Sequence, residues 1–153
     1  MSIQVFVIIN DMDHLAIMNS SWKLIPKIIS GEKTIESRWS VNKISPWKKV
    51  TSGEKVYFKD SGKKVSLVAV VSKVLYFDNL NEDLKLKILK KYGESISIRS
   101  VSKMMSWLKN KRYASLIFLK NPKVIKEPFN IDKRGFGSGI AWIVVNDINR
   151  IKI

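Results

Sequence analysis

The chain has 153 residues and a formal net charge of +15, with no Cys and a single His. The missing Cys excludes disulfides, Cys-built zinc sites and thiol nucleophiles, and one His excludes His-rich metal centres. With 45% hydrophobic residues, the length suits one folded domain with a real core. We therefore expect no metal and no other cofactor.

The N-terminal region begins with an apolar run over residues 3–9 that fits a strand or an ordered extension. We therefore divide the chain into an N-terminal extension or extra strand over residues 1–11 and a domain over residues 12–153. Whether translation starts at Met1 or at Met12 stays open, since a strand-like run follows each Met.

The domain is predicted to open with a strand and a short helix. The strand covers residues 13–18, and His14 within it is expected to be a structural, hydrogen-bonded residue rather than a catalytic one. Polar residues at 19–21 offer caps for a helix that ends at Ser30, where Gly31 takes the terminating position.

Alternation and turn signals then predict further strands and two helices. The strands are expected at residues 34–39, 54–59, 64–77, 113–120 and 140–145, and the helices at 80–92 and 101–109. Residues 64–77 are apolar on both faces, so this strand is central or lies in a closed barrel, with a bend near Ser72. Gly93 is predicted to end the first of the two helices.

The order of these elements lacks the regular strand–helix alternation of a doubly wound sheet. We predict an α+β fold in which short helices decorate a small mixed or antiparallel β-barrel. No segment approaches the ~20 apolar residues that a membrane-spanning helix needs, and no basic region precedes the first apolar run as in a secretory signal. We therefore expect a cytoplasmic protein that has no membrane partner.

The charge excess indicates a polyanionic partner such as nucleic acid, although compositional bias is an alternative. Only 5 of the 28 basic residues are Arg. Lys binds phosphate as a point charge, whereas Arg reads base edges in a bidentate manner. The balance therefore favours attraction to a nucleic-acid backbone over reading of bases in a groove.

The most informative motif is Gly31-x-Lys33-x-x-Glu36-x-Arg38. Glu36 and Arg38 share one face of the predicted strand, and Lys33 stands at its start. In a cleft, Lys33 could hold a phosphate or an oxyanion, Glu36 could act as a general base, and Arg38 could orient Glu36 or bind substrate. The alternative is a solvated strand face with alternating charges.

This motif, placed directly after a short helix, resembles the signature of the ASCH domain, which belongs to the PUA-like superfamily of small β-barrels. The glycine-led strand Gly53–Phe58, the long apolar strand through Val74 and the late strand extend the resemblance over about residues 12–150. The resemblance implies a PUA-like barrel with a cleft beside the motif, and a link to RNA.

Some ASCH proteins are similar to small amidohydrolases that deacylate a modified cytidine, and others to nucleases. In the amidohydrolase type the motif contains Lys-x-x-Thr with the Thr as nucleophile. Here Lys33 matches the Lys, but Glu36 stands at the Thr position. The resemblance therefore implies cleft positions for Lys33, Glu36 and Arg38 without implying covalent Thr catalysis.

Aromatic and basic residues alternate in two further segments. This pattern is typical of nucleic-acid binding, in which the bases stack on aromatic rings while Lys side chains neutralise the phosphates. Trp47 stands in a polar loop beside Lys48 and Lys49, and Tyr57 lies two positions from Lys59. The alternative for Trp47 is a ring that caps the end of the barrel. The remaining Trp residues are expected in the core; they are Trp22, Trp39, Trp107 and Trp142.

A glycine-rich segment, Lys133-Arg134-Gly135-Phe136-Gly137-Ser138-Gly139, could approach a ligand with its backbone. Lys133 and Arg134 would then add to an anion site; the alternative is a flexible connection between strands.

These patterns predict a nucleic-acid-binding protein, most directly RNA-binding, with a basic cleft around the motif, acting as a monomer or weak dimer. The first alternative is a small hydrolase in the same cleft, acting on a modified nucleoside or on RNA. The second is a protein-interaction module. The choice between RNA and DNA and the base preference stay open.

Overall fold

The computed structural model describes residues 11–153. Its strands are Asp13–Met18 (β1), Ile35–Ser40 (β2), Lys55–Asp60 (β3), Val65–Phe77 (β4), Tyr113–Phe129 (β5) and Trp142–Val145 (β6). Its helices are Leu24–Ser30 (α1), Glu82–Ile96 (α2) and Val101–Trp107 (α3), with 3-10 turns at Ser20–Trp22 (η1) and Ile148–Arg150 (η2). The extension or strand predicted at residues 1–11 lies outside the described residues, apart from Asp11.

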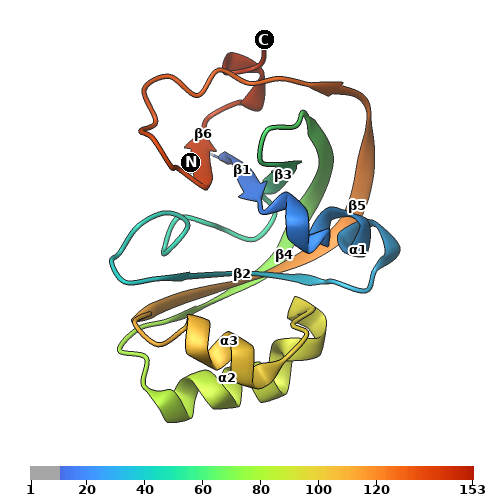
Figure 1. Cartoon of the computed structure of the whole chain (residues 1–153). Helices are drawn as coiled ribbons and strands as arrows, with labels where there is room; N and C mark the ends of the chain where they lie inside the picture. The colour runs from blue at the N-terminus through green and yellow to red at the C-terminus, as the bar shows by residue number, and fades with distance from the viewer. Residues whose placement is uncertain (1–10) are drawn as a thin grey trace, which may run out of the picture.

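All six strands form one mixed sheet in the order β2-β5-β4-β3-β1-β6. β1 runs parallel to β3, and the other neighbouring strands are antiparallel. The sheet curls into a half-barrel, and β2 crosses the molecule between the other strands and the α2–α3 pair (Figure 1). This confirms the predicted α+β fold, a small mixed β-barrel decorated by short helices.

The sheet bends along its two long strands, β4 and β5. Their register shifts between Val71 and Lys73, where the sequence predicted a bend. β5 runs further than expected, through Pro122 and Pro128. Both prolines fall at shifts in the β4–β5 register, where the ladder requires no backbone donor. The two prolines therefore do not end the strand.

The α2 helix does not end at Gly93, as predicted, but continues to Ile96. A Cβ at position 93 would lie 2.8 Å from the Ile98 side chain. Gly93 therefore permits close packing within the helix, and Ser97, with a φ of 71°, ends it instead.

The core has three parts, which occupy the half-barrel, the interface with α2 and α3, and the C-terminal end. Trp39 and Trp142 are buried as predicted. Trp22 and Trp107 are not core residues, because 49% and 48% of their surfaces are exposed. Each leaves about half of an indole in contact with water.

His14 is a buried structural residue, as expected. Its Nδ1 accepts a hydrogen bond from Trp142 Nε1 at 3.0 Å, so its Nε2 carries the proton and donates to Glu54 Oε1 at 2.9 Å. Glu54 also accepts from the backbone N–H groups of Met12 and Thr51. This network ties β1 to β6 and to the turn before β3.

We expect His14→Ala to lower the free energy of unfolding by about 2–3 kcal/mol, because it leaves the Trp142 N–H without an acceptor and removes one of the two donors to Glu54 Oε1. Urea denaturation measures the change, with Ser138→Ala in the exposed glycine-rich loop as the control. A loss under about 0.5 kcal/mol, the usual scale of surface substitutions, would contradict a stabilising role for the network.

Candidate nucleic-acid interface

The motif begins at the turn between α1 and β2. Gly31 ends α1 with a φ of 84°, a left-handed conformation that glycine adopts without strain. The next turn brings the Lys33 N–H to the Lys27 carbonyl at 3.0 Å, and β2 then pairs with β5. The helix-ending glycine therefore directs Lys33 into the interior at the start of β2.

Lys33 is one of the most deeply buried side chains, only 2% exposed. Its Nζ donates to the carbonyls of Ile35 at 2.8 Å and Ile96 at 2.7 Å, and it lies 3.4 Å from Glu36 Oε1. Ile96 is the last residue of α2, so the ammonium sits where the helix presents unpaired carbonyls and partial negative charge. All three ammonium protons therefore have partners inside the chain.

Arg38 extends this network across the open side of the half-barrel. Its guanidinium lies 3.3 Å from Glu36 Oε2 and donates to the carbonyls of Ile17 at 3.2 Å and Ala141 at 3.1 Å. It also lies over the Trp142 ring at 5.3 Å. Because β2 and β6 are the two edges of the sheet, Arg38 links one edge to the segment that leads into the other.

The three motif residues thus meet in one network, in which Lys33 and Glu36 are buried rather than exposed at the lip of a cleft. Glu36 is only 4% exposed, which contradicts the alternative of a solvated strand face. Each carboxylate oxygen of Glu36 has its own cationic partner, Lys33 on one side and Arg38 on the other.

Burial alone would raise the pKa of the Glu36 carboxyl. The charges and hydrogen bonds of Lys33 and Arg38 together outweigh burial, so the pKa of Glu36 lies below its ordinary value of 4.5. Burial lowers the pKa of Lys33 below 10.5, and Glu36 offsets only part of that effect. Glu36 is therefore an ionised and weakly basic carboxylate at neutral pH.

Glu36 should make the stability of the protein sensitive to acid. A carboxyl whose pKa is lower in the folded than in the unfolded state stabilises the fold above the unfolded value, here 4.5, and that stability is lost as the pH falls through the folded pKa. We expect the free energy of unfolding to fall below about pH 4.5 more steeply in the wild type than in Glu36→Gln. Urea denaturation at several acidic pH values measures the two slopes, and equal slopes would contradict this assignment.

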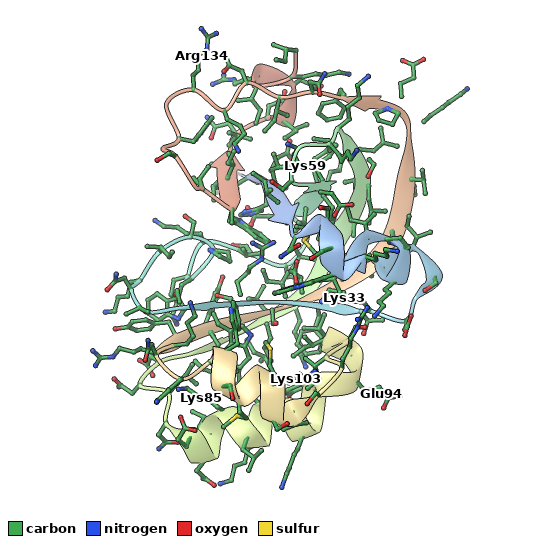
Figure 2. All side chains as sticks on the ribbon, in the orientation of Figure 1. Lys33, Lys59, Lys85, Glu94, Lys103 and Arg134 are labelled. Atoms are coloured by element: carbon green, nitrogen blue, oxygen red, sulfur yellow. The ribbon has the colours of Figure 1, made fainter. Side chains whose placement is uncertain are left out.

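A cavity of about 500 Å³ opens beside Lys33 and Glu36; we call it the motif cleft. Trp22 and Trp107 line it and stack edge to face, with ring centroids 6.3 Å apart. Three cationic side chains also line the motif cleft; they are Lys27, Arg99 and Lys103. Figure 2 labels Lys33 near β2 and Lys103 on α3. The motif cleft thus combines exposed aromatic rings with positive charge.

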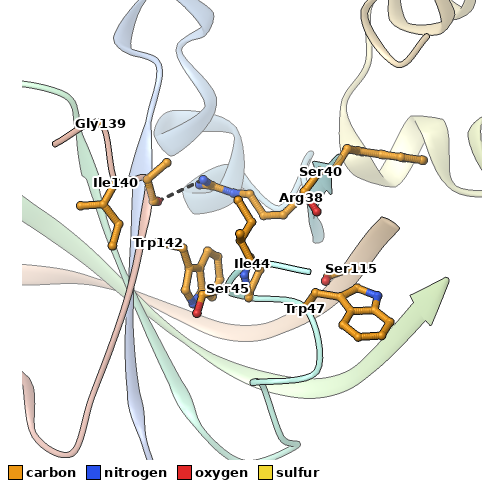
Figure 3. Close-up of a pocket in the computed structure, with 12 residues that line it drawn as sticks. Arg38, Ser40, Ile44, Ser45, Trp47, Ser115, Gly139, Ile140 and Trp142 are labelled. Carbon is orange, nitrogen blue, oxygen red and sulfur yellow. Dashed lines mark hydrogen bonds between the residues drawn. The ribbon is translucent and has the colours of Figure 1, made fainter. Parts of the chain in front are cut away.

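The second cavity, about 370 Å³, lies beyond Arg38 along β2; we call it the Trp47 pocket. Trp47 and Trp142 line it together with residues from the 40–46 loop, and Gly139 joins it from the glycine-rich segment (Figure 3). Lys48 Nζ lies 5.5 Å from the Trp47 ring, and Lys49 is exposed nearby in the chain. Trp39 lines both cavities, so the two are neighbours.

Besides Lys48 and Lys49, four predicted binding residues line neither cavity. Tyr57 packs edge to face on Phe129, with ring centroids 6.4 Å apart, and Lys59 is largely buried at the end of β3. Lys133 is exposed, and Arg134 pairs with Asp132 at 2.7 Å. In Figure 2, Arg134 lies at the end of the molecule opposite α2 and α3, away from Lys33. The structure therefore does not bring these four residues to the motif.

The sequence analysis did not predict the residues that supply the aromatic rings and the exposed positive charges of the motif cleft. Trp22, Lys27, Arg99, Lys103 and Trp107 come from η1, α1 and the segment that contains α3. One signal was available, since Lys103 and Trp107 are four residues apart and so share a helix face. The pairing of Trp107 with Trp22 depends on the tertiary fold and has no local signal.

The described part of the chain, residues 11–153, contains no helix with the length and apolarity to cross a bilayer. In the same range, no three Asp, Glu or His side chains gather in the way that metal ligands would.

The sequence matches no protein-family model and no curated protein. Among solved structures, it is similar to crystal structures of the ASCH protein from Zymomonas mobilis and of two point mutants of that protein. Each has a TM-score of 0.63 and 17% sequence identity to this chain, and the match covers 86% of this chain and 85% to 88% of theirs. At this identity the likeness concerns the fold. The chain therefore has the ASCH-domain fold that its motif predicted.

Proposed function

We propose that this protein binds single-stranded nucleic acid, most directly RNA, in the motif cleft. The observation that carries the proposal is the lining of this 500 Å³ cavity, where two half-exposed Trp rings stand among three cationic side chains. Single strands bind where bases stack on aromatic rings and basic groups track the phosphates. The same lining favours a nucleic acid over an uncharged or cationic partner.

Trp22 and Trp107 would offer stacking faces in this arrangement. Lys27, Arg99 and Lys103 would contact phosphates. The buried Lys33–Glu36 pair would hold β2 against the end of α2 and so fix the wall of the motif cleft. The ASCH fold supports this use, since the sequence resemblance implies a link to RNA. The proposal includes action in the cytoplasm as a monomer or weak dimer.

The geometry favours binding over hydrolysis. The Lys33 ammonium donates to the carbonyls of Ile35 and Ile96 and pairs with Glu36. None of its N–H groups is therefore directed at a ligand in this arrangement. Glu36, with its lowered pKa, is a weak general base. The acidic residues at the two ends of α2, Glu82 and Glu94, line neither cavity.

Salt dependence tests the phosphate contacts. For a fluorescein-labelled 12-nucleotide RNA, we expect log K to fall linearly with log[KCl] with a slope of about −2, because three cationic groups would each release roughly 0.7 counterion. Fluorescence anisotropy measures the affinity, with duplex RNA and single-stranded DNA as comparison ligands. Affinity that does not change with salt, or stronger binding to the duplex, would overturn the proposal.

A further inference from the structure

Two of the basic residues that line neither cavity, Lys59 and Lys133, come together beside the glycine-rich segment. In Figure 2, Lys59 and Arg134 lie on the side of β2 away from α2 and α3. We infer that Lys59, Lys133 and the backbone of residues 134–139 form a second anion site, which binds the phosphate group of a small phosphorylated ligand. This inference does not depend on the proposed function, because the second anion site shares no residue with the motif cleft.

The stem of Lys59 is packed among apolar side chains, and the residue is only 7% exposed. Its partners in the sheet register are Ile17 on β1 and Val65 on β4. Both belong to the apolar cluster at the C-terminal end, against which Phe136 of the glycine-rich segment also packs. The Ile17 N–H donates to the Ala141 carbonyl at 2.9 Å, which holds the end of that segment beside β1. An anion at the Lys59 ammonium therefore meets a side chain that is already ordered.

The Lys59 charge has no acidic partner within residues 11–153. The other two buried lysines, Lys33 and Lys85, each pair with a glutamate. Burial raises the pKa of the adjacent Asp60 carboxyl, and the charge that offsets part of this effect is that of Lys63, not of Lys59. A buried charge without a counter-charge is costly. The Lys59 ammonium is not among the atoms that are sealed from water without a partner, so an anion can reach it.

Lys133 places a second positive charge near the first. Burial lowers the pKa of Lys59 below 10.5, and the charge of Lys133 lowers it further. Lys133 is exposed, and the acidic residue before it is already paired. Arg134 Nε and Nη2 donate to Asp132 Oδ2 at 3.0 Å and 2.7 Å. Two neighbouring cations thus lack an acid, and a bound anion would relieve their mutual repulsion.

The glycine-rich segment supplies the backbone part of the second anion site. Gly135, Gly137 and Gly139 have φ values of 89°, 89° and 73°. Left-handed residues in a turn direct nearby N–H groups to one side, and such concave backbone binds phosphate. Asp132 at the start of the segment would repel an extended polyanion that passed along it, whereas a compact anion avoids this carboxylate. The site therefore fits a phosphate monoester or a diphosphate better than a nucleic-acid backbone.

Pyrophosphate is the probe for the second anion site. It is titrated at low salt into the isotope-labelled full chain, and amide chemical shifts are followed by NMR. We expect saturable shifts at the three glycines Gly135, Gly137 and Gly139. Lys59→Met keeps most of the buried volume and removes the charge, so it should raise the Kd by about tenfold, the usual consequence of losing one charged hydrogen bond. The control Lys64→Met removes an exposed lysine five residues along the chain and should leave the Kd within about twofold.

A second variant keeps the test independent of folding. Lys133→Gln changes an exposed side chain and should also raise the Kd by about tenfold, with an unchanged urea midpoint. Shifts that do not saturate, shifts spread over the exposed lysines, or equal effects of Lys59→Met and Lys64→Met would overturn the inference, because each means an adventitious ion only.

RNA binding distinguishes the two sources of a phosphate group. Anisotropy is measured with the 12-nucleotide RNA, with and without a 5′-phosphate, on the wild type and on Lys59→Met. We expect Lys59→Met to leave both affinities within about twofold. A preference for the 5′-phosphorylated RNA that Lys59→Met abolishes would assign the site to RNA ends and overturn the small-ligand inference. Pyrophosphate binding without RNA binding would overturn the proposed function and leave the second anion site standing.

Discussion

Replacing Glu36 by alanine should lower the free energy of unfolding by about 3–5 kcal/mol, the usual consequence of removing one partner from a buried ion pair. The change leaves the Lys33 ammonium inside the protein with two carbonyls and no counter-charge. It also deprives Arg38 of a carboxylate at the point where this side chain crosses the open side of the half-barrel. Urea denaturation at neutral pH measures the loss.

A double-mutant cycle separates the ion pair from simple loss of packing. Lys33→Met keeps most of the side-chain volume and removes the charge, so it should be less damaging in the Glu36→Ala background than in the wild type. We expect a coupling free energy of about 1–3 kcal/mol. Additive effects, or a loss under about 1 kcal/mol for Glu36→Ala, would show that the pair does not stabilise the fold.

Replacing both Trp22 and Trp107 by alanine should weaken RNA binding by about 10-fold to 100-fold. Stacking of a base on an aromatic side chain contributes roughly 1–3 kcal/mol, and 1.4 kcal/mol corresponds to a factor of ten. About half of the surface of each Trp residue is exposed. The double substitution should therefore lower the free energy of unfolding by less than the substitution of a buried Trp would. Anisotropy titration and urea denaturation of the same preparation measure binding and stability side by side.

Matched controls identify the location of the effect. Phe136→Ala removes a ring from the glycine-rich segment, outside both cavities, and should leave RNA affinity within about twofold. Lys103→Glu should weaken binding and flatten the salt slope, whereas Lys152→Glu, at the other end of the chain, should do so much less. Equal effects of the two charge reversals would indicate diffuse attraction by the whole basic surface.

Local patterns predicted the elements and the fold because each depends on neighbouring residues. Gly31 ends α1 where the sequence indicated, and the paired apolar faces of residues 64–77 mark the central strand β4. Predictions failed where a distant contact decided the outcome. Gly93 packs against Ile98 rather than ending a helix, and Tyr57 faces Phe129 rather than a ligand.

The candidate site was predictable in part for the same reason. Spacing brought Glu36 and Arg38 together on one strand face, and the motif placed Lys33 beside them. Lys33 donates to the carbonyl of Ile96, which lies 63 residues away in the chain. No local sequence pattern predicts this contact. A charged triad expected at the lip of a cleft is therefore a buried support, and the exposed binding groups come from η1, α1 and α3.

Photo-crosslinking tests the central claim most directly. A single-stranded RNA that carries 4-thiouridine is bound to the full chain at low salt, irradiated and digested, and the crosslinked peptides are identified by mass spectrometry. We predict crosslinks at Trp22 and Trp107 in the motif cleft. Crosslinks confined to the lysine-bearing exposed face of α2, with none at these rings, would contradict the account.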